Sequence, residues 1–448
     1  MSFDAKSIQS ALQKAKRPEL ARILSGVWNI SLTEYSGSLW ETTAAPPPLE
    51  VELRQAFATE FCRIGFTEEQ AQKYSEELER TRVLQTATHL TASEGPTFLA
   101  LHNLALLGIP QGETYFVGSY SGVPFANAAW SGCLNFSNRI DLESVISVHA
   151  PGFADLKRAD NDRVRDSSDR RISLIPGKMR DVRVFQSRIP EKMAVLMTHF
   201  SEPILGISPK AKTGDDFTKW ASKFCTNQLG KIFPSKSIIY FDLNEVIRNY
   251  LALVIANSNH PINQLFFDHA VRDSVFAVFP SDTPLFTVDV NYKNKIRQES
   301  VVLNGGELLS QNFKLKLTHE NLINKIKSGA LCPGLFLGFT ALSFINGFIC
   351  FGSFEQVEYL ARFKQKWLKL DLLDNEIVFN HIIGRIYRGD FESINLFLAG
   401  EIEWYYLQRI LQPLTLLYAL FKTEIAFWLT DIIIKLTCYI CFFILSRK

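Results

Sequence analysis

Strand-like apolar runs and helix-length patterns follow one another along the middle of this chain, and this alternation constrains its fold most. Residues 113–118, 194–199 and 237–241 have the apolar, β-rich character of buried strands. Helical periodicity fills residues 214–232 and 244–258. Strands that alternate with helices of these lengths are typical of a parallel sheet covered by helices. The sequence therefore predicts an α/β protein with a Rossmann-like core and a helical C-terminal region.

Composition narrows the class of protein further. The chain has 448 residues, of which 47% are hydrophobic and 21% charged, so it can bury a large core and is not a disordered protein. Its formal net charge is only +2, which gives no overall field for attracting nucleic acid. Seven cysteines without a repeated spacing favour a reducing compartment over a disulfide framework. No secretion signal is recognisable in the first 20 residues. We expect a cytoplasmic protein that acts on a small molecule and does not bind nucleic acid.

Changes in charge and in hydrophobic pattern along the chain predict four regions. Residues 1–45 are expected to form a helical segment, and 49–318 the α/β core. A run of mixed charges at about 157–192 interrupts that core and predicts a basic surface insertion. Residues 319–424 are expected to be a helical region that completes the pocket, and 425–448 an apolar C-terminal helix.

Local signals place several shorter elements. The helical pattern at 4–28 breaks at Pro18, and the helix expected over 67–85 begins at the N-cap residue Thr67. A further helix is predicted over 49–64, and another over 98–109. The runs predicted as short strands are FAVF (276–279), LFTVDV (285–290), SVVL (300–303) and FKLKL (313–317), with a turn at 304–306.

The apolar stretch at 425–445 is long enough to cross a bilayer. Asp431 and Lys435 lie near its middle and together cost about as much free energy of insertion as the apolar residues contribute. We expect a helix that docks on the protein or makes peripheral contact with a membrane, and a tail anchor is the alternative.

Familiar catalytic motifs do not occur in this sequence. There is no P-loop pattern, no GxGxxG dinucleotide pattern and no HExxH or paired CxxC metal pattern, so no cofactor or metal is assigned. The segment from Gly118 to Gly122 resembles a nucleophile elbow, but its central residue is Tyr120 instead of serine.

A polar loop with a Gly-Pro step precedes the helix predicted at 98–109. A helix N-terminus offers free N–H groups and a positive dipole end, which suit a phosphate, a carboxylate or a sugar hydroxyl. The same polar side chains could instead only cap the helix. The candidates in this loop are His89 as a catalytic acid or base, and Thr88, Ser93, Glu94, Gly95 and Pro96 as substrate contacts.

Two more loops carry candidate residues. Ser121 and Asn127 follow the strand predicted at 113–118, and ligands of open α/β sheets gather outside the carboxyl ends of strands. Both residue types are also common turn formers. The third loop follows the apolar run that ends at Cys350, and its chemistry again fits either a capped helix or a wall of the pocket. Its candidates are Glu355 as an acid or base, with Gly352, Gln356 and Tyr359 as substrate contacts.

The order and spacing of these segments resemble the bacillithiol synthase family of putative cysteine-adding ligases. The resemblance lies in THLTASEGPTFLALHN (88–103), then LFTVD (285–289), IKSGALCP (326–333) and GFICFGSFEQVEYL (347–360). It implies a small-metabolite ligase or transferase acting on an amino acid or an amino-sugar conjugate. The acidic-His loop of that family is replaced by the Gly118–Gly122 segment. A non-catalytic binding protein with the same fold is therefore the second hypothesis.

Overall fold

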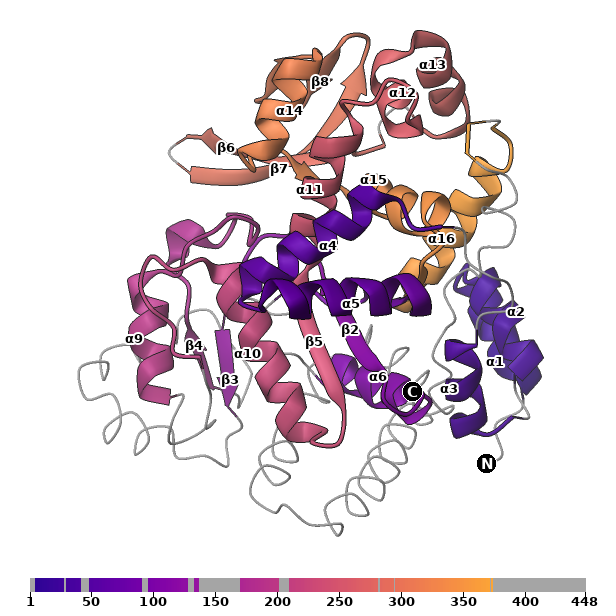
Figure 1. Cartoon of the computed structure of the whole chain (residues 1–448), viewed down its shortest axis with the longest axis vertical. Coiled ribbons are helices and arrows are strands. Elements are labelled where there is room, and N and C mark those ends of the chain that lie inside the picture. Colours follow the sequence, from indigo (N-terminus) through magenta and orange to yellow (C-terminus); the bar gives the residue numbers. More distant parts are fainter. Residues whose placement is uncertain are drawn as a thin grey trace.

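The computed structural model describes residues 5–27, 30–41, 48–90, 96–127, 133–136, 170–200, 209–280, 283–293, 295–370 and 372–373. The parallel sheet and its helices form one half of the molecule, and an antiparallel sheet with α12, α13 and α14 forms the other (Figure 1). The helices are α1 (Ala5–Lys14), α2 (Pro18–Val27), α3 (Leu32–Trp40), α4 (Val51–Ile64), α5 (Glu68–Thr81), α6 (Pro96–Leu107), α9 (Glu191–Phe200), α10 (Phe217–Ile232), α11 (Leu243–Val254), α12 (Pro261–Phe267), α13 (His269–Val278), α14 (His319–Lys327), α15 (Leu335–Phe339) and α16 (Phe354–Trp367). A 3₁₀ turn covers Gly177–Met179, and a π-helix covers Thr340–Ile345.

Four parallel strands form the central sheet in the order β11-β1-β2-β5. The register of β2 with β5 runs from Thr114 opposite Ser237 to Ser119 opposite Asp242. An antiparallel sheet has the order β10-β6-β7-β8-β9, and β3 pairs with β4 in a separate ribbon. The strands are β1 (Val83–Gln85), β2 (Thr114–Ser119), β3 (Cys133–Phe136), β4 (Arg170–Ser173), β5 (Ser237–Asp242), β6 (Phe286–Tyr292), β7 (Lys295–Asn304), β8 (Glu307–Leu309), β9 (Lys314–Lys316), β10 (Cys332–Pro333) and β11 (Ile349–Phe351).

Successive residues of the parallel strands enter two different hydrophobic cores. Leu84 and Phe116 belong to the core that also contains residues of α4, α11 and α16. Val83, Tyr115 and Val117 belong to the core that contains residues of α3, α6 and α10. Because side chains alternate across a strand, these cores lie on opposite faces of the sheet. The chain is therefore a mixed α/β protein with a parallel sheet flanked by helices.

The N-terminal helices lie on the far side of β2 from β5 (Figure 1), which is the side of the β11 edge in the strand order. The side chain of Glu358 in α16 accepts hydrogen bonds from the backbone nitrogens of Glu19 and Leu20, each at 3.1 Å, and so caps α2. On α3, Trp40 Nε1 donates to the carbonyl of Ala105 in α6 at 3.0 Å. The N-terminal segment thus contacts both helices that follow the neighbouring strands β1 and β11.

Several predicted elements are confirmed. Pro18 begins α2, and α5 begins with a capping box in which Thr67 and Gln70 exchange side-chain-to-backbone hydrogen bonds. The strands predicted at 113–118 and 237–241 are β2 and β5. The segments LFTVDV, SVVL and FKLKL lie in or beside β6, β7 and β9.

Other predictions gave the wrong type of secondary structure or the wrong end of a helix. Residues 194–199 belong to helix α9, and FAVF (276–279) lies mostly in helix α13. The helix expected to reach residue 85 ends at Thr81, because Arg82 takes a left-handed conformation and the chain enters β1. Short apolar runs have no periodicity of their own that separates a strand from a buried helix.

The charged run at 157–192 is described from residue 170 onward, and the part after residue 173 is not a solvated insertion. Leu174, Val184 and Ile189 are buried in the core that contains α6 and α10. Arg183 is also buried, and it donates to the carbonyls of Thr287 and Gly329 in the other half of the molecule. These carbonyls, together with an ion pair in which Arg183 Nε lies 3.6 Å from Asp289 Oδ1, explain how a basic residue is accommodated there.

The tail predicted at 425–445 lies outside the described residues. Among the helices that the structure describes, none combines the length and the apolar character needed to cross a membrane.

Candidate functional site

Strands β1 and β11 are neighbours and run parallel, with Val83 opposite Ile349 and Gln85 opposite Phe351. The helices that follow them pack on opposite faces of the sheet: Leu104 of α6 belongs to one core and Leu360 of α16 to the other. Loops that leave neighbouring strands toward opposite faces separate at the carboxyl edge, where open α/β sheets bind their ligands. This edge is the candidate site.

Hydrogen bonds join the first and third predicted loops directly. The backbone nitrogen of Thr86 donates to the Phe351 carbonyl at 2.8 Å. The buried side chain of Gln356 donates through Nε2 to Thr86 Oγ1 at 2.7 Å and to the carbonyl of Cys350 at 3.4 Å. Although about 270 residues separate them in sequence, the segments after β1 and β11 form one polar cluster.

Gly352 allows this arrangement. A Cβ atom at residue 352 would lie 2.2 Å from Cδ of Gln356, so any larger residue would displace the amide from Thr86. Ser353 caps α16 by accepting a hydrogen bond from the Gln356 backbone. The capping role and the proximity to the first loop therefore occur together in this segment.

The first and second predicted loops also meet. Thr88 Oγ1 lies 2.6 Å from Ser119 Oγ, and backbone hydrogen bonds link Thr88 and Leu90 to Tyr120. The ring nitrogen Nδ1 of the half-buried His89 lies 3.0 Å from Oδ1 of Asn127. With the amide oxygen as acceptor, Nδ1 carries the proton and Nε2 has the lone pair of a base.

The surroundings of Ser121 fit a role in stabilising the fold. It is fully buried, and its hydroxyl donates to Asp242 Oδ1 at 2.6 Å. The glycines on either side of it are explained by packing, since a Cβ at Gly118 would lie 3.2 Å from the ring of Phe241, and one at Gly122 would lie 2.9 Å from the ring of Tyr120.

Two predicted residues of α16, the acid–base candidate Glu355 and the substrate contact Tyr359, have different partners. The exposed carboxylate of Glu355 forms an ion pair with Arg17 of the N-terminal segment, with Arg17 Nη1 2.6 Å from Glu355 Oε2. Tyr359, one helical turn further along α16, packs its ring against Phe339 with 5.6 Å between centroids, and burial raises the pKa of its phenol. Glu355 therefore faces the N-terminal helices, whereas Tyr359 faces the interior.

The first predicted loop is described up to Leu90 and again from Pro96 onward. Ser93, Glu94 and Gly95 lie outside the described residues. Pro96 is the first residue of α6, which fits the preference for proline in the first turn of a helix.

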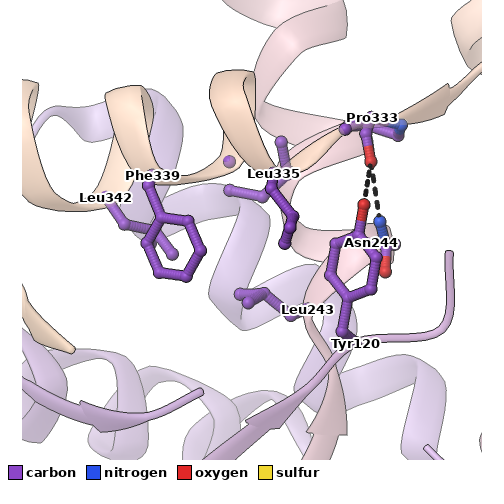
Figure 2. Close-up of a pocket in the computed structure, with 10 residues that line it drawn as sticks. Tyr120, Leu243, Asn244, Pro333, Leu335, Phe339 and Leu342 are labelled. Atoms are coloured by element: carbon purple, nitrogen blue, oxygen red, sulfur yellow. Dashed lines mark hydrogen bonds between the residues drawn. The ribbon is translucent and has the colours of Figure 1, made fainter. Parts of the chain in front are cut away.

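A small apolar cavity lies at the same edge of the sheet, beyond the ends of β2 and β5. The Tyr120 hydroxyl and the Asn244 side-chain nitrogen both donate to the carbonyl of Pro333, each at 3.0 Å (Figure 2). Burial, as the largest cause, raises the pKa of Tyr120, so its phenol stays protonated at neutral pH. The residues that line the cavity are Tyr120, Leu243, Asn244, Ile247, Pro333, Gly334, Leu335, Gly338, Phe339 and Leu342.

Sequence reasoning missed Thr86, Tyr120 and Asn244. A nucleophile elbow needs serine at the position of Tyr120, so the motif gives this residue no role, and Thr86 opens the first polar loop immediately after the helix predicted over 67–85. Asn244 follows the strand predicted at 237–241 by three residues, and this position at a strand end was the available signal.

Within the described residues, no group of three or more His, Cys, Asp or Glu side chains is placed to hold a metal ion. No family model, no curated protein and no solved structure matches this chain. The resemblance to the bacillithiol synthase family therefore remains a prediction.

Proposed function

We propose that the chain is a small-metabolite ligase or transferase with a Rossmann-like core, whose substrate binds at the carboxyl edge of β1 and β11. The observation that carries the proposal is the divergence of α6 and α16 to opposite faces from neighbouring parallel strands. The substrate class, an amino acid or an amino-sugar conjugate, follows from the resemblance of the loop segments described above.

The polar groups at this edge suit a ligand with hydroxyl, amine and carboxylate functions. Thr86, Thr88 and Gln356 supply hydroxyl and amide groups from both strand ends. His89 is half-buried, its ring is oriented by Asn127, and an imidazole titrates close to neutral pH. We assign His89 the role of general acid or base, and the hydroxyl and amide groups the role of substrate contacts.

A ligand titration tests the binding step. Amino acids, amino sugars and nucleotides are added to the full chain while its melting temperature is followed, because a ligand that binds only the folded state stabilises it by RT ln(1 + [L]/Kd). We expect one of the first two classes to raise the melting temperature. If none of these compounds stabilises the chain, the proposal is wrong.

The variant His89→Gln tests the assigned catalytic role. General acid–base catalysis contributes about 10²- to 10⁴-fold to rate, so turnover of the substrate found by titration should fall by at least about 10²-fold. The control is His269→Gln, which alters an exposed histidine on α13 and should leave turnover unchanged.

A non-catalytic binding protein is the second candidate function. The observation that favours it is the engagement of Glu355 by Arg17, which gives this carboxylate a partner on the N-terminal helices. It predicts stabilisation by a ligand without turnover, and equal affinity in wild type and His89→Gln.

A further inference from the structure

A cleft lies between the N-terminal helices and α16. Figure 1 shows α1 and α2 beside α16, and the side chain of Glu358 joins them by capping α2. The cleft has a volume of about 380 Å³, which falls within the range of about 300–1,000 Å³ that is usual for small-molecule sites. The residues that line it are Gln13, Lys16, Pro18, Glu19, Glu358, Ala361, Arg362 and Gln365.

The segments that form this cleft are strongly basic. Residues 5–27 and 354–367 together contain eight Lys or Arg and three Glu, whereas the whole chain has a formal net charge of only +2. Arginines already engage two of the three carboxylates, in the ion pairs Arg17–Glu355 and Arg22–Glu19. Positive charge is therefore concentrated at this cleft well beyond what the carboxylates beside it can neutralise.

Lys16 and Arg362 are the cations that line the cleft. Both are exposed, and neither forms an ion pair within the described part of the chain. An arginine fork and a lysine ammonium both bind the oxygens of carboxylates and phosphates. The amide side chains of Gln13 and Gln365, one from each wall, add further hydrogen-bond donors. An oxyanion is therefore the chemistry that this cleft attracts.

Glu358 gives the cleft a buried acceptor as well. It is only 3% exposed, and its Oε1 accepts both hydrogen bonds from the first turn of α2. Its Oε2 forms no hydrogen bond with a described residue, although the carboxylate lines the cleft. A carboxylate oxygen accepts from an ammonium or a hydroxyl group, and a buried polar atom is costly without a partner. A ligand that carries such a donor beside its oxyanion would satisfy this oxygen.

We propose that this cleft binds a small organic oxyanion, a carboxylate or a phosphate, that also carries an ammonium or hydroxyl donor. The oxyanion contacts Lys16 and Arg362, and the donor contacts Glu358. Because the walls come from α1, α2 and α16, the bound ligand holds the N-terminal helices against α16. The cleft shares no residue with the polar edge of the sheet, so this inference does not depend on the proposed function.

Calorimetric titration of the full chain with four compounds tests this assignment. L-glutamate and glucose 6-phosphate combine an oxyanion with donor groups. Glutarate and inorganic phosphate are their matched oxyanions, which lack the ammonium and the sugar hydroxyls. We expect L-glutamate or glucose 6-phosphate to bind about tenfold or more tightly than its matched oxyanion, because a hydrogen bond to a charged group contributes at least that much.

The variants Arg362→Gln and Lys16→Gln locate the bound compound. Each removes a cation from an exposed side chain outside the hydrophobic cores, and each should weaken binding about tenfold or more. Lys14→Gln is the matched control, because it removes the same charge from α1 at a residue that does not line the cleft. Its affinity should change by less than about twofold, since salt screens a charge that does not touch the ligand. Hydrogen exchange in α1 and α2 of wild type should slow when the compound is added.

The outcomes separate this cleft from the polar edge of the sheet. If a compound binds and neither Arg362→Gln nor Lys16→Gln weakens it, the compound binds elsewhere, and this inference is overturned while the proposed function stands. If none of the four compounds binds, the inference is overturned as well. Loss of binding in Arg362→Gln together with unchanged binding in His89→Gln supports the cleft, whatever the fate of the proposed function.

Discussion

At the scale of single residues, the most unusual feature is a group of buried carboxyls at the end of β5. Glu60, Asp242 and Glu245 are fully buried. Arg63 forms an ion pair with Glu60, and Arg248 one with Glu245. Asp242 accepts at Oδ1 from Ser121 and Asn244, while its Oδ2 has no hydrogen-bond partner among the described residues.

Asp242 is therefore expected to be a neutral acid in the folded protein. Burial, followed by the nearby carboxylates of Glu245 and Glu60, raises its pKa well above the usual range. A raised pKa of the folded state means that its contribution to stability is present at acid pH and is lost as pH rises toward that pKa.

The substitution Asp242→Asn tests this assignment, because an amide closely imitates a protonated carboxyl. The variant should match wild type in stability below about pH 3.8, the ordinary pKa of this carboxyl, and exceed it increasingly as pH rises above that value. Urea unfolding across this pH range measures the difference. A variant that is less stable by the same amount at every pH would show that Asp242 is ionised.

Glu50 has the opposite shift. Burial raises its pKa, but hydrogen bonds from His260, Tyr250 and Asn346 outweigh burial, and the net pKa is lowered. The stability that Glu50 contributes is thus present at neutral pH and is lost as pH falls below about 4.5 toward the lowered pKa. Glu50→Gln should destabilise the protein by about 1–3 kcal/mol at pH 7. In unfolding experiments below pH 4 the two proteins should converge, and a constant gap would contradict the assigned charge.

At the scale of the element, the docking of α3 on α6 depends on Gly108. A Cβ at this residue would lie 2.1 Å from the carbonyl carbon of Ser36 in α3. Trp40 of the same helix packs against Phe351 of β11, with 5.4 Å between ring centroids. Replacing a hydrogen atom of Gly108 by a methyl group would therefore push α3 away from the end of α6.

We expect Gly108→Ala to destabilise the protein by about 2 kcal/mol or more, because overpacking forces the backbone of α3 away from α6. The tryptophan emission of the variant should also shift as Trp40 loses its contact. Gly37→Ala is the control, since a Cβ there would meet nothing within 4 Å. Equal effects of both substitutions would mean that the contact between residue 108 and α3 does not decide stability.

At the scale of the whole molecule, Asn244 connects the two halves. Its side chain accepts from the backbone nitrogens of Ser121 and Gly122 beyond β2, and donates to the carbonyl of Pro333 in β10. Arg183 makes a second connection to this half through the carbonyl of Thr287. These bonds link the parallel sheet to the antiparallel sheet through buried polar groups.

Removing the Asn244 side chain should destabilise the half that contains the antiparallel sheet more than the half that contains the parallel sheet. Asn244→Ala takes away the three hydrogen bonds named above, each of about 1 kcal/mol, so we expect about 3 kcal/mol of destabilisation or more. Hydrogen exchange should accelerate most in β6 and β10, with less change in β2 and β5. Uniform acceleration throughout the described residues would show that the two halves unfold as one cooperative unit.

The sequence by itself determined the elements whose signals are local. The capping box of Thr67 and Gln70 marks the start of α5, and the apolar runs at 113–118 and 237–241 mark β2 and β5. Local signals suffice there because a helix satisfies its hydrogen bonds within itself, and because aromatic and β-branched residues dominate these two runs. The α/β class follows from these elements alone.

Only the tertiary structure decided β1 and β11, which have three residues each, and the meeting of Thr86 with Gln356. A strand of three residues has no stability or periodicity of its own, and it exists because its backbone groups pair with neighbours far away in sequence. For the same reason, the apolar run FAVF became part of α13 and not a strand. The candidate site depends on such pairings, since its two loops follow strands that are defined by one another.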